Sequence, residues 1–478
     1  MRRRDLLLAG LSLPALAARA QTLPNPQAAK RDDTVGAGYS RLVIARWGDA
    51  LLPEAPPFTP AALTGEQADT QFPYDAVIGA LITPPQGQDG IPRLVLVTAN
   101  PTAPARMMFA PGADSPDVAG REQGVTVMNL QYLNNRWVSV DGGYQARRLA
   151  DGTLCQISGP AVMAIGNSVQ GVLAVQDACA TPWSTVLLAE GDAAPWLTRL
   201  ATVGYGYGNP ATAALFGWVV EFNALDPQSI PVKRTALGRI ARAGIAATAT
   251  ADGRPVVFFT QDDPNGCLFR FVGAGPGLDA GTLSVARVTG TTLAWADLGS
   301  DIPTLAGLAG AAQSAGGTGF NAPGGLAVGE GVLYLAESGG DGRVTSFVTK
   351  DFSARTYTSA VVVTGGDTGT GTWLRCPRRV SLDAAGRLWI GTDQGGDTAA
   401  TADGLFVLSA GVLSAAYFAP VGAALGGAAV DPGTNTVFAA VRHPGATPSA
   451  SYNFPATRWP TLLPNMPPQT TIIGLVPA

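Results

Sequence analysis

The sequence has 478 residues, a formal net charge of −4, 14% charged residues and 60 glycines. This charge balance creates no basic field, and no stripe of Lys and Arg runs along the chain, so we expect no nucleic-acid partner. The length suits two or three average domains, although large β architectures often reach it as a single unit.

The N-terminus has the pattern of an export signal. Three arginines at positions 2–4 precede an apolar run from Leu6 to Ala18, and Ala18-Arg19-Ala20 resembles a cleavage site. Adjacent arginines before the apolar run favour the twin-arginine route. The alternative, a short membrane anchor, is disfavoured because the run is too short to span a bilayer. We predict a signal peptide over residues 1–20, a periplasmic or secreted protein, and no membrane span after cleavage.

Short apolar or alternating runs bounded by Gly, Asp and Pro follow from Arg41 onward, which is typical of strands joined by tight turns. The clearest predicted strands are Leu42–Arg46, Arg93–Val97, Gly124–Leu130, Phe216–Phe222 and Val256–Thr260. One short helix is expected within Leu305–Ala315. The uncharged stretch Ala410–Val430 contains Pro420 and several glycines, so it predicts strand, loop and strand rather than a membrane segment.

A weak internal repeat indicates the fold. Three segments, Ala322–Glu337, Cys376–Asp393 and Gly426–Val441, each read as strand, Asp/Gly turn and strand, and they recur about every fifty residues. This period is typical of propeller blades, whose radial arrangement leaves only short sheet edges. A sandwich of hairpins is the alternative. Proline-rich stretches at Leu52–Pro60 and Thr457–Pro468 predict loops or a wrapping tail.

The predicted organisation is therefore all-β. It comprises a flexible segment over residues 21–40 and one β-propeller domain over residues 41–478, with loop insertions and a proline-rich C-terminal tail. No stretch of the sequence reads as an inter-domain linker.

The four cysteines, Cys155, Cys179, Cys267 and Cys376, form no C-x-x-C pair, which excludes zinc-ribbon and thioredoxin-like motifs. An oxidising compartment would permit disulfides, and four cysteines allow three pairings. Buried free thiols are an equally good interpretation.

Acidic residues follow several predicted strands. They are Glu190 and Asp192, Asp262 and Asp263, Glu337, and Asp393. If these strands are equivalent in successive blades, the carboxylates lie on one face near the central axis, where hard oxygens could hold calcium. The alternative is that Asp and Glu only end strands as turn residues.

His443 is the only histidine, so multi-histidine metal sites are excluded and any Ser-His-Asp or Cys-His site must use it. A structural histidine at a blade edge is the simpler interpretation.

Several motifs in chain order resemble one family, the PhoX-type alkaline phosphatases. They are Arg46-Trp47-Gly48-Asp49, Tyr144–Leu149, Ser158-Gly159-Pro160-Ala161, Thr181-Pro182-Trp183, Trp218–Glu221, Lys233–Arg239, Asp262-Asp263, Gly386–Ile390 and His443-Pro444-Gly445. The run from Trp218 to Arg239 is the most specific. The resemblance implies a six-bladed propeller, twin-arginine export and, in active members, an iron–calcium cluster that hydrolyses phosphate monoesters.

The resemblance breaks at the positions where the family has its active-site residues. Its Cys-Glu-Glu segment corresponds to Ala189-Glu190-Gly191, its His-Glu to Arg242-Ala243, and its Arg-Pro-Glu to Ala322-Pro323-Gly324. Its Asn-His-Glu corresponds to Thr98–Asn100, and its Cys-Pro-Asp-Asn to Cys376–Arg379. A multinuclear cluster needs several anionic ligands, so this loss predicts a propeller without the phosphatase site.

The resulting hypothesis is an exported binding or repurposed protein, expected to be a monomer, in which arginines hold a small anion or phosphate ester directly. The candidate pocket comprises Glu190, Asp192, Arg242, Asp262, Asp263, Arg378, Arg379 and His443. Glu190 and Asp262 are the candidate metal ligands, for calcium; iron is not expected. The alternatives are a calcium-dependent phosphomonoesterase and a partner-binding propeller with a large apolar face.

Overall fold

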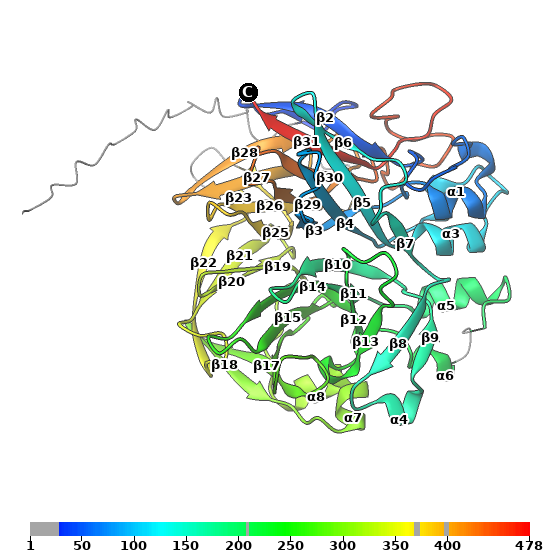
Figure 1. Ribbon diagram of the computed structural model, residues 1–478. Coiled ribbons are helices and arrows are strands. Elements are labelled where there is room, and N and C mark those ends of the chain that lie inside the picture. Colours follow the sequence, from blue (N-terminus) through cyan, green and yellow to red (C-terminus); the bar gives the residue numbers. More distant parts are fainter. Residues whose placement is uncertain (1–27, 207–209, 368–372, 396–400) are drawn as a thin grey trace, which may run out of the picture.

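The computed structural model describes residues 28–206, 210–367, 373–395 and 401–478, so the predicted signal peptide lies outside the described residues. Antiparallel sheets dominate the secondary structure of the described residues, as the alternating sequence predicts (Figure 1). The helices are short, and none of those described is long and apolar enough to cross a membrane.

The strands form six blades of four main strands each. The first blade comprises β3 (Val77–Ile82), β4 (Arg93–Asn100), β5 (Gly124–Leu133) and β6 (Arg136–Ser139), and the second comprises β10 (Val175–Ala180), β11 (Val186–Glu190), β12 (Val219–Phe222) and β13 (Val232–Arg234). The third comprises β14 (Arg242–Ala249), β15 (Pro255–Gln261), β16 (Leu268–Gly273) and β17 (Gly281–Thr289), and the fourth comprises β19 (Pro323–Gly329), β20 (Val332–Glu337), β21 (Arg343–Val348) and β22 (Thr356–Thr364). The fifth comprises β25 (Pro377–Leu382), β26 (Leu388–Thr392), β27 (Gly404–Ser409) and β28 (Val412–Phe418), and the sixth comprises β29 (Ala424–Val430), β30 (Val437–Arg442), β31 (Thr471–Pro477) and β2 (Tyr39–Arg46).

Further strands extend this frame. The second blade gains β8 (Leu154–Ser158) and β9 (Ser168–Gln170), and β7 (Arg147–Leu149) pairs with β5. The third and fourth blades join at their outer edges because β18 (Thr292–Asp297) pairs with both β17 and β22. Within the segment predicted to be flexible, β1 (Thr34–Val35) pairs with β28.

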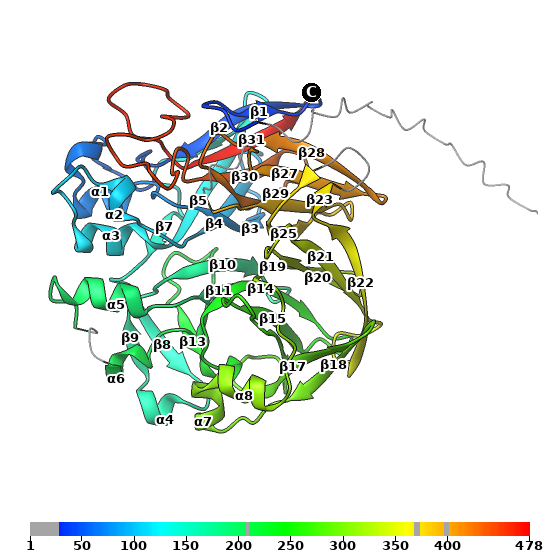
Figure 2. The same cartoon turned by 180° about the vertical axis from the view of Figure 1, so that it is seen from behind.

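The first strands of the six blades, β3, β10, β14, β19, β25 and β29, lie side by side around a central channel, each in contact with the next and β29 with β3 (Figures 1 and 2). The six-bladed propeller prediction is therefore confirmed. The last blade combines the two ends of the chain, because β31 pairs with β30 on one side and with β2 on the other.

The three sequence repeats correspond to the inner hairpins of the last three blades, β19–β20, β25–β26 and β29–β30. In all six blades the register between the first two strands shifts near the start of the first strand, for example between Pro377 and Arg379 and between Val175 and Asp177. Such bulges turn a strand and re-aim its side chains. Here they lie where the strands begin, next to the channel.

The apolar core lies between neighbouring blades. One cluster joins the third and fourth blades through Phe258, Leu335 and Phe347. Another joins the fifth and sixth blades through Trp389 and Val437. Face-to-face packing of the sheets around a ring buries both faces of each blade, which explains the many apolar strands.

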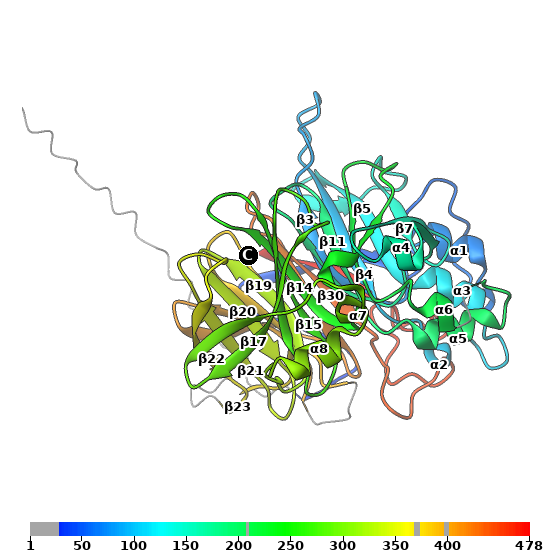
Figure 3. The ribbon, with the colours of Figure 1, turned by 90° about the horizontal axis from the view of Figure 1, so that it is seen from below.

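Three helices, α1 (Gly65–Thr70), α3 (Pro116–Glu122) and α5 (Ala194–Ala201), gather at one side of the ring (Figure 3). The helix expected within 305–315 is two short helices, α7 (Ile302–Ala306) and α8 (Leu308–Ser314), which meet at Gly307. The predicted strand, loop and strand over 410–430 are β28 and β29. All four cysteines are free thiols, which resolves the open pairing.

Candidate functional site

The predicted acidic residues share one end of the propeller. Within each inner hairpin the second strand ends beside the start of the first, as the pairs Val175–Glu190, Arg242–Gln261 and Pro323–Glu337 show. We call the end at which the six inner strands begin the N-terminal mouth of the channel, and the opposite end the C-terminal mouth. Acidic residues that follow second strands therefore lie at the N-terminal mouth.

Glu190, at the end of β11, is fully buried in an ion pair. Its Oε1 accepts from Lys233 Nζ at 2.7 Å, and neither side chain is exposed. Backbone amides of Leu173, Gly217 and Trp218 also donate to this carboxylate at 3.0–3.2 Å. Both oxygens are thus engaged by protein donors, which satisfies a charge that would otherwise be costly to bury.

Asp262, directly after β15, pairs with Arg378 at the start of β25. Arg378 Nη2 lies 3.0 Å from Asp262 Oδ1, and the two side chains are 21% and 36% exposed. Asp263 and Asp192 are exposed turn residues whose Oδ1 atoms accept from the amides of Asn265 and Ala194. They hold local turns, as the simpler interpretation of these residues expects.

His443 belongs to a buried network around Asp75. Its Nε2 lies 2.8 Å from Asp75 Oδ1, and Arg442 donates to both oxygens of Asp75, from Nε at 2.9 Å and from Nη2 at 3.0 Å. Thr102 Oγ1 donates to Asp75 Oδ2 at 2.8 Å, and Arg442 Nη1 reaches Asp393 Oδ2 at 3.3 Å. Burial alone would raise the pKa of Asp75, but Arg442 and His443 hold it well below its usual range.

The His443 ring stacks on Tyr74, with ring centroids 5.8 Å apart and planes at 12°, and its side chain is 22% exposed. Because a carboxylate lies beside Nε2, the proton of the neutral ring belongs on Nε2, which leaves Nδ1 as the acceptor. His443 is thus a partly exposed histidine oriented by a buried carboxylate.

Arg242, predicted in the pocket, is buried away from it. Its guanidinium donates to the carbonyls of Leu237, Gly238, Ile240 and Gly217 at 2.5–3.1 Å and lies over the Phe259 ring at 4.4 Å. Burial lowers its pKa to about 9. All of these partners are structural, so Arg242 fastens the entry of β14 to the preceding loops.

Arg379 extends from β25 into the channel itself. Nη1 donates to the Ala243 carbonyl at 3.0 Å, Nη2 to the Gln176 carbonyl at 2.9 Å, and Asp177 Oδ2 lies 3.6 Å away. Its side chain is only 5% exposed. Arg379 therefore bridges three blades across the channel.

The structure thus brings Arg378 and Asp262 together, and places His443 with Arg442 and Asp393 at the same mouth. It does not bring Glu190 into contact with Asp262. Among the residues that the structure describes, no group of three or more His, Cys, Asp and Glu could hold a metal ion.

Sequence reasoning missed Asp75, Thr102, Lys233 and Asp177 as members of these networks. Lys233 lies in the family-like run Lys233–Arg239, and Asp75 lies two residues before the apolar strand β3, so both carried a signal. Asp177 sits inside a strand with no local mark of its position.

Comparison with known proteins agrees with this architecture. The family described as alkaline phosphatase PhoX matches residues 22–445. PhoX from Pseudomonas fluorescens, solved in complex with vanadate, superposes with a TM-score of 0.84 at 23% identity over 96% of this chain and 98% of that chain.

Weaker likenesses include a Xanthomonas campestris gluconolactonase (TM-score 0.35, 12% identity, 86% of this chain and 99% of that one) and a Trypanosoma rangeli sialidase (0.38, 8%, 91% and 59%). The search of curated proteins gives no match. Because the family match covers most of the sequence, the chain belongs to the PhoX family of alkaline phosphatases.

Proposed function

We propose that this PhoX-family protein works without the iron–calcium phosphatase cluster and binds a small oxyanion at the N-terminal mouth. One observation carries the proposal: both carboxylates expected to survive from the metal site are engaged by cations of the chain. Glu190 pairs with Lys233 at 2.7 Å and Asp262 with Arg378 at 3.0 Å.

The donor set does not fit a multinuclear cluster. Such a cluster needs several anionic ligands to offset its charge, whereas Ala189, Ala243 and Gly324 occupy expected ligand positions. A Cβ atom at Gly324 would lie 2.4 Å from the Arg378 carbonyl oxygen, so this backbone leaves no room for a glutamate there. We therefore derive no reaction step through iron.

Cations at the N-terminal mouth support anion binding instead. Arg378 is partly exposed, and its partner Asp262 is exposed enough to be displaced by a ligand oxyanion. Arg442 is fixed by Asp75, and His443 beside it offers a ring nitrogen to a protonated phosphate oxygen. Bidentate guanidinium groups suit phosphate and carboxylate, which need no metal to bind in this way.

We further propose that residues 1–20 direct export by the twin-arginine route and that residues 41–478 act as one monomeric domain.

Calcium is the one metal that the surviving carboxylates would suit, because it accepts oxygen ligands in loose geometry. Glu190 and Asp262 are its candidate ligands, and of these two side chains only Asp262 is exposed.

A second candidate is a calcium-dependent phosphomonoesterase. Family membership and the likeness to a PhoX protein solved with vanadate favour it. The two functions can be told apart by measurement. The proposed function is metal-independent binding of an oxyanion, whereas the second candidate hydrolyses a phosphate ester and needs calcium to do so.

The deciding experiment measures metal content and phosphate binding of mature protein purified without chelator. Elemental mass spectrometry should find no stoichiometric iron, and phosphate binding should survive EDTA. Arg378→Gln should weaken it about tenfold. Arg355→Gln is the matched control, because Arg355 is 77% exposed and pairs with Asp297 instead. Stoichiometric iron with calcium would overturn the proposal. Calcium alone, with calcium-dependent hydrolysis of p-nitrophenyl phosphate, would establish the second candidate.

A further inference from the structure

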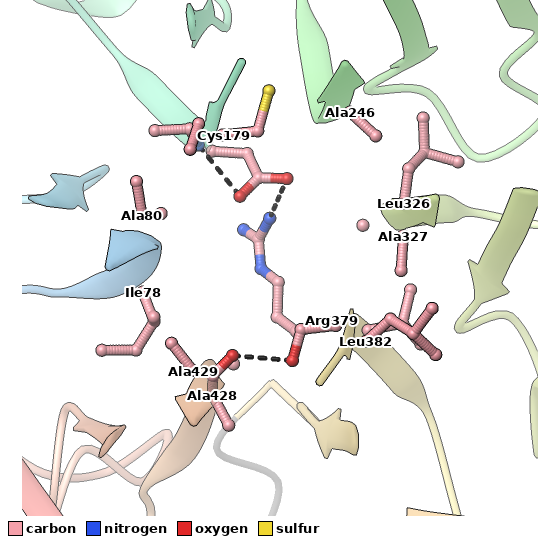
Figure 4. A pocket seen from close by; sticks show the side chains of 18 of the residues that line it. Ile78, Ala80, Cys179, Ala246, Leu326, Ala327, Arg379, Leu382, Ala428 and Ala429 are labelled. Carbon is pink, nitrogen blue, oxygen red and sulfur yellow. Dashed lines mark hydrogen bonds and ion pairs between the residues drawn. The ribbon is translucent and has the colours of Figure 1, made fainter. Parts of the chain in front are cut away.

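The C-terminal mouth holds a cavity of its own. It has a volume of about 310 Å³ and is lined by residues from all six inner strands, nearly half of them alanine or glycine, with Leu326 and Leu382 among the others. Figure 4 shows Arg379 reaching from β25 into the middle of this ring. The side chains proposed to bind an oxyanion, Arg378 and His443, belong to the N-terminal mouth instead.

Arg379 has hydrogen-bonding capacity that the protein does not use. Its guanidinium has five N–H groups. One donates to Ala243 and one to Gln176, and within the described part of the chain its buried Nε has no partner. A buried unpaired donor is costly, so native structures normally supply it with an acceptor. With the second N–H groups of Nη1 and Nη2, the guanidinium therefore keeps donors that no acceptor of the described chain satisfies.

The other charges of the cavity limit what that acceptor can be. Asp177 stands 3.6 Å from Arg379, and its carboxylate already accepts from the amides of Ala178 and Ile245. Asp383, at the rim, is engaged by Arg387 at 2.7 Å and by Trp389 Nε1 at 2.9 Å. A single guanidinium partly offset by Asp177 suits a monoanion better than a phosphate dianion, which needs more than one cation.

We propose that this cavity binds a small organic acid, with its carboxylate on Arg379 and its apolar body against the alanines of the inner strands. A carboxylate matches the planar edge of a guanidinium, and the volume is at the lower end for small-molecule sites. The proposal does not depend on the function proposed for the N-terminal mouth.

The test uses butyrate as the probe and n-butanol as its uncharged counterpart, measured by saturation-transfer NMR on the mature protein. Ala180 lies at the exposed end of β10 and lines the cavity. A charged side chain in its place therefore alters the charge of the cavity without disturbing the core. At low salt, Ala180→Glu should weaken butyrate binding about threefold and Ala180→Lys should strengthen it. Arg379→Gln should abolish it, and the Ala180 pair keeps the test valid if that variant does not fold.

Arg378→Gln separates the two sites, because it should impair phosphate binding and leave butyrate binding intact. Equal binding of butyrate and butanol would overturn the proposal. So would Ala180 variants with unchanged affinity, or loss of butyrate binding in Arg378→Gln, which would place the acid at the N-terminal mouth.

Discussion

The buried ion pair of Glu190 and Lys233 predicts that Glu190 stabilises the fold and is not a metal ligand. Neither side chain has any exposure, and Lys233 Nζ also lies 4.1 Å from the centre of the Phe216 ring. Removing one partner of a buried pair leaves an uncompensated charge and costs about 3–5 kcal/mol. Lys233→Met should therefore destabilise the protein by that amount.

For a mature chain of roughly 460 residues, the unfolding entropy is about 1 kcal/mol per kelvin, so this loss lowers Tm by about 3–5 °C. Glu190→Gln should cost at least as much, because either orientation of the amide turns its NH₂ toward backbone N–H donors or Lys233. The double variant should be less destabilised than the sum by about 1–3 kcal/mol.

The assay is thermal unfolding followed by circular dichroism at one scan rate, in EDTA and again in calcium. Arg355→Met is the control and should change Tm by less than 1 °C, about the worth of an exposed pair. The reasoning fails if Lys233→Met unfolds like the wild type. It also fails if calcium stabilises the wild type and Glu190→Gln alone abolishes that effect, because Glu190 would then be a metal ligand.

Three further predictions follow from buried or crowded positions. Asp75→Asn breaks the two-point bond to a buried guanidinium and should lower stability by about 3 kcal/mol in denaturant titrations; an unchanged midpoint would contradict the network. Gly324→Ala places a Cβ 2.4 Å from a backbone carbonyl of the next blade and should cost about 1–3 kcal/mol, whereas Gly310→Ala, in an exposed helical turn with nothing within 4 Å, should be neutral or stabilising by about 0.5–1 kcal/mol. Burial raises the pKa of Glu122 to about 7, so the contribution of Glu122 to stability is complete below pH 4.5 and is lost as pH rises through 7. Glu122→Gln should remove about 3 kcal/mol of this pH dependence. Parallel curves of stability against pH for the two proteins would refute the prediction.

The sequence predicted the fold far better than the site, for a physical reason. Inner hairpins such as β19–β20 are local, since strand, turn and strand lie within sixteen residues and show alternation. Arg442 and Asp75, by contrast, are 367 positions apart and meet only because the ring closes.

The same limit applies to single charges. Arg242 and Arg378 are both predicted pocket residues. The Arg242 guanidinium donates to four backbone carbonyls, whereas the Arg378 side chain is partly exposed. Burial of a charged side chain depends on distant backbone atoms, which no local pattern records. The shared mouth of the acidic residues was predictable from strand equivalence, whereas their individual partners were not.

The closing blade also constrains when this protein can fold. Strand β2 has no partner until β31 exists, and Gln469 Nε2 donates to the Trp47 carbonyl across 422 positions. Synthesis must therefore pass residue 477 before the ring can close, and until then β2 is an unpaired segment whose backbone N–H and C=O groups are open to other chains. Long-range closure of this kind favours completing the fold in one compartment before transport, as the proposed twin-arginine route, which carries folded proteins, would allow.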